Sequence, residues 1–190
     1  EYTWASDKST KEEYKSLFRH RTFGPKWKNN KFAFIDSLEA PVGAWVNALV
    51  VDKSHRNSLK KNDNAKEQLL IDLPNANQKG EWSERYAARL LNAKKHYEQT
   101  STNAKNMEVL IENGVNNEFM IEVYQQVLKL THFSFETLLL LEKYDTVTSE
   151  KEVQETVENI MKQRIKFNLI RDELETVYGL TRILNKPENY

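Results

Sequence analysis

Apolar residues recur every three or four positions along the second half of the chain, from Gly80 onward. This spacing places apolar side chains on one face of an α-helix, and its persistence over many turns is typical of the long helices of a bundle. It predicts helices over residues 81–113, over residues 118–144, and from about 150 to 178 or 184. At about 1.5 Å per residue, each helix is about 40 to 50 Å long.

The three predicted helices differ in the width of their apolar faces. The first carries one stripe: Trp82, Tyr86, Leu90, Ala93, Tyr97, Ala104, Met107 and Ile111. The second carries two adjacent rows, Met120, Val123, Val127, Leu130, Leu138 and Leu141 beside Tyr124, Leu128, Phe135 and Leu139. The third carries Val153, Val157, Ile160, Phe167, Ile170, Leu174 and Val177. The double width of the second stripe predicts that this helix is buried on two sides.

The connections between these helices are short. Gly114 tolerates the positive φ at which helices commonly end, and Asn116 or Asn117 can cap the next helix. Ser149 and Glu152 form the capping-box pattern at the start of the third helix. Short turns make successive helices antiparallel neighbours, so the sequence predicts a long antiparallel three-helix bundle.

The first part of the chain is less regular. Ser9 and Glu12 match a capping box, and the helix that they open is expected to end near Gly24 and Pro25. One face of this helix carries Tyr14, Leu17 and Phe18.

Two further short helices are predicted before residue 78. An apolar helix over residues 31–50 is expected to kink or split at Pro41, and another is expected from Asn64 to just before Pro74. The fold class is therefore all-α, with residues 1–78 forming short helices and residues 79–190 forming the three-helix bundle.

Composition narrows the classes of function. The 190 residues include 28 basic and 28 acidic side chains, so there is no overall field to attract nucleic acid or an anionic membrane. The absence of Cys excludes disulfides, thiolate zinc sites and Cys nucleophiles. No apolar run approaches the roughly 20 residues that cross a bilayer. We therefore expect neither a nucleic-acid partner nor a membrane span.

Motifs for catalysis or cofactor binding are scarce. The four histidines lie on separate predicted elements without the i, i+4 spacing of a helical metal site: His20, His55, His96 and His132. Acidic residues alternate with Lys and Arg on helix faces, which is the pattern of solvated ion pairs rather than of a hydrolytic pair. Glycine-rich phosphate loops are missing. The sequence predicts no cofactor, no metal and no catalytic residue within this chain.

Two clusters permit a functional or a structural interpretation. The stretch "RHRTFGPKWKNNK" interleaves cations with aromatic rings, as single-strand-binding surfaces do, but the balanced charge of the chain favours an ordinary basic loop. Aromatic residues of the long helices could line a carbohydrate groove, although at helical spacing a core position is favoured. They are Trp82, Tyr86, Tyr97, Phe133, Phe135 and Tyr144.

The beginning of the chain carries a resemblance. "EYTW", the following "STKEEYKSLFRHRTFG" and the apolar "FIDSLEAPVGAWVNALV" resemble the last strand and closing helix of the (β/α)₈ barrel in family 20 glycoside hydrolases, the β-N-acetylhexosaminidases. The final "RDELETVYGLTRILNKPENY" resembles the helical region that follows the barrel in some bacterial members. Tyr2 and Trp4, at strand spacing with no Met before them, also lead us to expect a piece of a longer protein.

This resemblance implies a site at the very start of the chain. An aromatic at the carboxyl end of a barrel strand lies on the active-site face, so Trp4 would stack on the bound sugar, with Glu1 near it. The family's catalytic Asp-Glu pair comes from earlier strands and has no match here.

We therefore expect a non-catalytic, C-terminal accessory region of an exported glycoside hydrolase acting on N-acetylhexosamine-containing glycans. Its expected location is the periplasm or the cell surface. Its partners would be the barrel of the same parent chain, with a glycan or a second subunit as further candidates. The alternative is a helical protein–protein interaction module with no enzymatic link, which would bind through an exposed apolar stripe.

Overall fold

The computed structural model describes residues 10–25, Pro41, Ala48 and residues 71–179. These residues form five helices, which are α1 (Lys11–Phe23), α5 (Glu81–Arg85), α6 (Ala87–Glu112), α7 (Glu118–Thr146) and α8 (Glu150–Gly179). The all-α prediction and its bundle-like packing are confirmed for the described chain. The comparison with a barrel and the division at residue 78 stay predictions.

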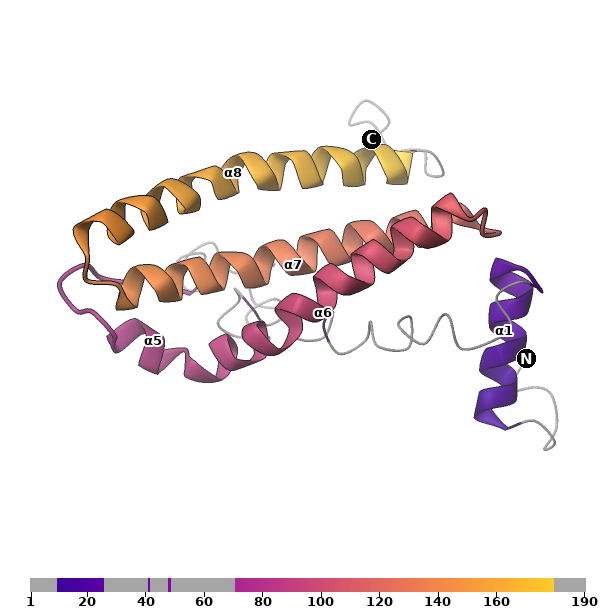
Figure 1. Cartoon of the computed structure of the whole chain (residues 1–190), viewed down its shortest axis with the longest axis horizontal. Helices are drawn as coiled ribbons and strands as arrows, with labels where there is room; N and C mark the ends of the chain where they lie inside the picture. The colour runs from indigo at the N-terminus through magenta and orange to yellow at the C-terminus, as the bar shows by residue number, and fades with distance from the viewer. Residues whose placement is uncertain (1–9, 26–40, 42–47, 49–70, 180–190) are drawn as a thin grey trace, which may run out of the picture.

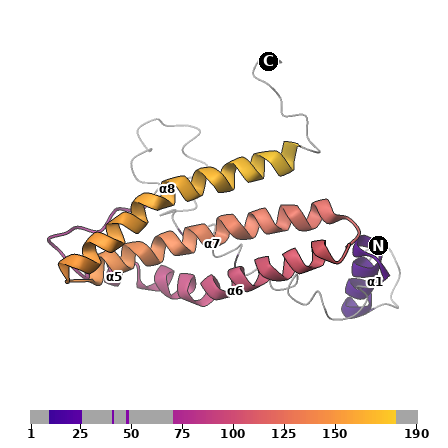
Figure 2. The same ribbon diagram turned by 45° about the horizontal axis from the view of Figure 1, so that its top comes forward.

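Helix α7 lies at the centre of the packing. Figures 1 and 2 show α6, α7 and α8 running side by side, with α7 between the other two. Both neighbours pack against it along much of their length. Residues on both of its predicted apolar rows are buried, Leu138 and Leu141 on one and Leu128 and Phe135 on the other, and Ile121, outside both rows, is buried as well. The prediction that this helix is covered on two sides is therefore confirmed.

The apolar core between α6 and α7 consists of two clusters. The first lies where α1 meets the α6–α7 turn and contains Phe23, Met107, Leu110, Val115, Ile121 and Leu128. The second lies at the opposite end and contains Ala48, Ile71, Trp82, Leu90, Ala93, Phe135, Leu138 and Leu141. Buried polar side chains occupy the positions between them, namely His96, Thr100, Asn103, Thr131 and Ser134. We call these five residues the polar belt.

Helix α1 begins one residue later than predicted. The capping box is made by Thr10 and Glu13 instead of Ser9 and Glu12, because "STKEE" contains two overlapping copies of the pattern. The helix ends as predicted at Gly24, whose φ of 103° suits a residue without a β-carbon. The carbonyl of Phe23 accepts a hydrogen bond from the backbone N–H of Asn116 at 3.0 Å, which joins α1 to the α6–α7 turn.

The prediction of one continuous helix over residues 81–113 is wrong at one point. Tyr86 leaves helical geometry, with φ −103° and ψ 16°, and separates α5 from α6. At this bend the indole Nε1 of Trp82 donates to the backbone carbonyl of Asp72 at 2.7 Å, and the Tyr86 hydroxyl hydrogen-bonds to the Asp72 carboxylate. The bend allows two aromatic residues of one stripe to contact the same preceding segment.

The turn between α6 and α7 agrees with the sequence, except in its cap. Gly114 has the positive φ that we predicted, 68°. Asn117 occupies the N-cap position of α7, but in a left-handed conformation, with φ 56°, and without a side-chain capping bond. Its amide therefore does not play the role that we predicted for it.

The apolar stripe predicted for the last helix is partly wrong. Ile170 is buried as expected and Thr156 is fully buried, whereas Val157 is exposed. Phe167 contacts the Phe133 ring of α7 but is also exposed. Because α8 packs mainly on α7 among the described helices, a narrower strip of its surface is covered than a closed three-helix bundle would require.

Apart from Pro41 and Ala48, the predicted helix over residues 31–50 lies outside the described residues, as does most of the one from Asn64. Ile71 to Leu73 are not helical.

A buried carboxylate at the end of α7 fixes the start of α5. Asp145 Oδ2 accepts hydrogen bonds from the backbone N–H of Ser83 at 2.8 Å and from its hydroxyl at 2.7 Å. The Asp145 carbonyl also accepts from the backbone N–H of Gly80. Asp145 thus caps a helix that lies 62 residues earlier in the chain.

We expect Asp145→Ala to lower the free energy of unfolding by about 2 kcal/mol, because a buried cap is lost and two donors of α5 are left without it. Urea unfolding followed by circular dichroism measures the change. Asp172→Ala, which removes an exposed acidic residue of α8, serves as the control and should change stability by no more than about 0.5 kcal/mol. Equal effects of the two substitutions would contradict the capping role.

Candidate functional site

The two residues predicted to bind substrate, Trp4 and Glu1, lie outside the described residues. So do the lysines of the basic cluster and Trp27 between them. Within its described part, Arg19 is buried and lies in α1, and therefore does not belong to an open basic surface. The candidate sites that remain belong to α1 and to the helices that follow residue 71.

The aromatic residues that could have lined a sugar groove are mostly part of the core. Trp82 and Phe135 are fully buried, and Tyr86 and Tyr97 pack against the same apolar cluster. The Trp82 and Tyr86 rings lie 5.0 Å apart. Burial, together with the hydrogen bond to Asp72, raises the pKa of the Tyr86 hydroxyl. The core interpretation favoured from the sequence is confirmed for these residues.

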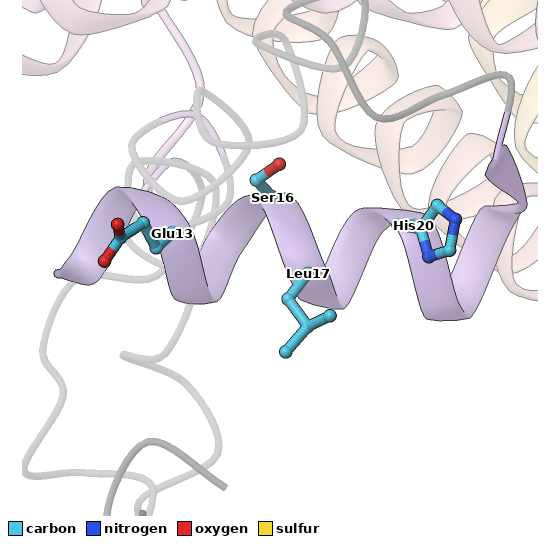
Figure 3. Close-up of a pocket in the computed structure, with 4 residues that line it drawn as sticks. All are labelled: Glu13, Ser16, Leu17 and His20. Carbon is cyan, nitrogen blue, oxygen red and sulfur yellow. The ribbon is translucent and has the colours of Figure 1, made fainter. Parts of the chain in front are cut away.

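An open cavity of about 380 Å³ lies along α1 and is lined by Glu13, Ser16, Leu17 and His20. Figure 3 shows Ser16 and Leu17 projecting to opposite sides of the helix. The Glu13 carboxylate already accepts hydrogen bonds from Thr10 in the capping box. These side chains do not converge on one point, so the cavity has the geometry of a surface groove rather than of a catalytic pocket.

The most organised polar group of the described chain lies beside the polar belt, between α6 and α7. His132 stacks on Tyr97 with ring centroids 4.3 Å apart. Its Nδ1 lies 3.0 Å from the Thr100 hydroxyl and 3.2 Å from the Tyr97 carbonyl oxygen. The Thr100 hydroxyl in turn donates to the same carbonyl at 2.8 Å. A hydroxyl beside an imidazole is the arrangement used in nucleophilic catalysis, where the imidazole takes the hydroxyl proton.

The contacts of this group are those of a link between two helices. The Tyr97 carbonyl oxygen can only accept, so a hydrogen bond to it from His132 Nδ1 requires a proton on that nitrogen. In that arrangement the Thr100 hydroxyl donates to the same carbonyl and accepts from Nδ1. Activation of a nucleophile requires the opposite, an imidazole nitrogen that takes the hydroxyl proton. Thr100 is also completely buried, so the group joins two helices and does not form a catalytic dyad.

Charged residues of α7 and α8 lie next to this group. Lys166 of α8 pairs with Glu136 of α7, and Lys129 of α7 pairs with Glu173 of α8 at 2.6 Å. Burial and the positive charge of Lys166 lower the pKa of His132. The neutral imidazole is therefore the form that the folded chain favours.

Within the described residues, no group of three or more His, Cys, Asp or Glu side chains could hold a metal ion. None of the helices in these parts of the chain is both long and apolar enough to cross a membrane. Asp145 and the His132 group are the polar features that sequence reasoning missed. Their partners lie 62 and 32 to 35 residues away, beyond the reach of any local motif.

Comparisons of the chain with protein-family models, with curated proteins and with solved structures gave no match.

We expect acid to weaken the fold through His132. A folded-state pKa below the ordinary value of about 6.5 means that the contribution of His132 to stability is complete above that value, and is lost as the pH falls toward the lower folded-state pKa. The midpoint of thermal unfolding, measured between pH 7.5 and 5, should therefore fall with pH in the wild type. The fall should be smaller in His132→Asn, whose amide can still donate to the Tyr97 carbonyl.

His20→Asn, which removes a histidine of α1 away from this group, is the matched control and should keep the dependence due to His132. A pH dependence of the same size in His132→Asn as in the wild type would contradict this account.

Proposed function

We propose that this chain is a non-catalytic helical accessory region of an exported glycoside hydrolase that acts on N-acetylhexosamine-containing glycans. The observation that carries the proposal is the resemblance of residues 1–4, 9–24 and 34–50 to the last strand and closing helix of the hydrolase barrel. Helix α1 supports it, because its range Lys11–Phe23 and its end at Gly24 agree with the helix that the resemblance requires after the strand. Trp4 then stacks on the sugar, and Glu1 lies near it.

The role proposed for the rest of the chain is mechanical. Three long helices held through α7 make a stiff layer, and α1 is attached to one end of that layer by the hydrogen bond between Phe23 and Asn116. Such a layer is suited to bracing a barrel at the point where its last helix ends. It also offers a broad surface for a glycan or for a second subunit.

A second candidate function is a helical protein-interaction module without an enzymatic link. The observation that favours it is the row of exposed apolar side chains along α8. Apolar surface that no other element covers is a common property of docking faces.

The first proposal predicts that this chain alone has no hydrolytic activity and that its longer parent protein does. A chromogenic N-acetylglucosaminide is the substrate for both assays. We expect turnover by the parent and none by residues 1–190. The gene upstream of Glu1 should encode a barrel with an adjacent Asp-Glu pair on an earlier strand. An unrelated upstream domain, or turnover by this chain alone, would overturn the proposal.

Substitution of Trp4 tests its proposed subsite role in the parent enzyme. Loss of a stacking ring removes roughly 1 kcal/mol of binding, so we expect Trp4→Ala to raise KM several-fold, up to about tenfold. Phe18→Ala, which removes an exposed aromatic ring of α1, is the control and should leave KM unchanged. An unaltered KM in Trp4→Ala would remove Trp4 from the site without affecting the assignment of the parent.

A further inference from the structure

The outer surface of α8 carries a continuous apolar ridge. Its four side chains are spaced four residues apart and are exposed. The exposed fractions are 37% for Val157, 71% for Met161, 65% for Ile165 and 60% for Leu169. Residues at i, i+4 and i+8 form one of the ridges through which helices pack into the grooves of other helices. We call these four residues the α8 ridge. Figures 1 and 2 show α8 on the outside of the layer, with α7 on its inner side.

Charge is distributed unevenly along α8. Residues 150–158 carry four acids and one base, and residues 171–175 carry three acids and one base. The central stretch, residues 162–166, carries three bases and no acid. The ridge therefore crosses a basic centre that has an acidic segment on either side.

Two of the central cations form no ion pair with the residues that the structure describes. Lys166 pairs with Glu136 on α7. Lys162 contacts the neutral amide of Asn159 at 3.4 Å, and Arg164 has no ion pair among the described residues. Lys162 and Arg164 come directly after Met161 and directly before Ile165, the two central residues of the ridge. They place positive charge, not paired within the described part of the chain, at the middle of the apolar surface.

We propose that the α8 ridge is the docking surface for an amphipathic helix of another protein, one that presents an apolar row with carboxylates beside its centre. The apolar rows would interlock as packed helices do, and the carboxylates would pair with Lys162 and Arg164. This proposal makes the interaction-module function specific, and it does not depend on the assignment to a glycoside hydrolase.

The same charges disfavour two other occupants. If a second copy of α8 lay with its ridge centred on this one, parallel or antiparallel, its basic centre would face the basic centre of the first copy. An anionic membrane would meet the acidic segments at both ends, and α8 as a whole carries seven acids and five bases. An acidic partner helix is the occupant that the pattern accommodates at the centre of the ridge.

The interaction is expected to be weak, because four side chains make a contact well below the area of a standard stable interface. The probe is a fluorescent synthetic helical peptide with Leu at every fourth position and Glu beside the central leucines. Its matched counterpart carries Lys in place of each Glu. We expect saturable binding of the Glu peptide at about 10 to 100 μM in low salt, and binding of the Lys peptide at least about tenfold weaker.

Variants identify the surface. Ile165→Ser should weaken binding of the Glu peptide about tenfold, as expected for loss of a central apolar anchor. Leu91→Ser is the matched control, because Leu91 of α6 is just as exposed, and it should leave binding unchanged. The double substitution Lys162→Glu with Arg164→Glu should reverse the preference and favour the Lys peptide. All of these positions are exposed, so the variants should fold, as circular dichroism will verify.

Four results would overturn the proposal. They are equal binding of the two peptides, binding unaffected by Ile165→Ser, a dimer in sedimentation that Ile165→Ser dissociates, and co-sedimentation with phosphatidylserine vesicles that Met161→Ser abolishes. The third result would assign the ridge to a second copy, and the fourth would assign it to a membrane. None of them bears on the activity of the parent protein, so a failure here is distinguishable from a failure of the hydrolase proposal.

Discussion

The burial of α7 on two sides is the constraint on which the rest of the structure depends. A helix whose apolar surface is twice the usual width is stable in water only when elements on both sides cover it. Each large apolar side chain that becomes fully buried contributes about 1.5 to 3 kcal/mol, and α7 supplies five of the buried apolar residues. Helices α6 and α8 cover the two apolar sides of α7. The need to bury both sides explains why one helix lies on each side of α7.

This central position leaves α8 with one covered face. Its contact with α7 includes Thr156 and Ile170, the Phe133–Phe167 ring pair and two ion pairs to Lys129 and Glu136. The outer ridge is then left to solvent or to a partner. In a closed three-helix bundle α8 would also contact α6, and part of this ridge would be covered. The ridge is exposed because the three helices form an open layer with α7 in the middle.

The polar belt also fits this arrangement. Thr131 and Ser134 are buried, and each donates its hydroxyl proton to the carbonyl four residues earlier on its own helix, at 2.7 Å and 3.1 Å. Because such hydroxyls are satisfied within their own helix, they can occupy a helix–helix contact without a partner across it. The core between α6 and α7 is consequently interrupted by a polar section, where His132 and Thr100 link the two helices.

Periodicity was sufficient to predict the long helices, the two-sided burial of α7 and the positive φ of Gly114, because each is encoded within a few residues. The bend at Tyr86 was not predictable in this way, since it depends on bonds to Asp72. The capping boxes that begin at Ser9 and at Thr10 match the same sequence pattern, so the sequence did not distinguish between them. The cap from Asp145 to Ser83 and the face that α8 presents to α7 are tertiary features, and the candidate site at Trp4 rests on resemblance alone.

Residue-resolved amide hydrogen exchange tests the central role of α7 most directly. If both neighbours depend on α7, its central amides should exchange only through global unfolding, with the highest opening free energies in the chain, while the middle of α8 opens at a lower free energy. An α8 protected as strongly as α7, or an α7 that opens first, would contradict the account.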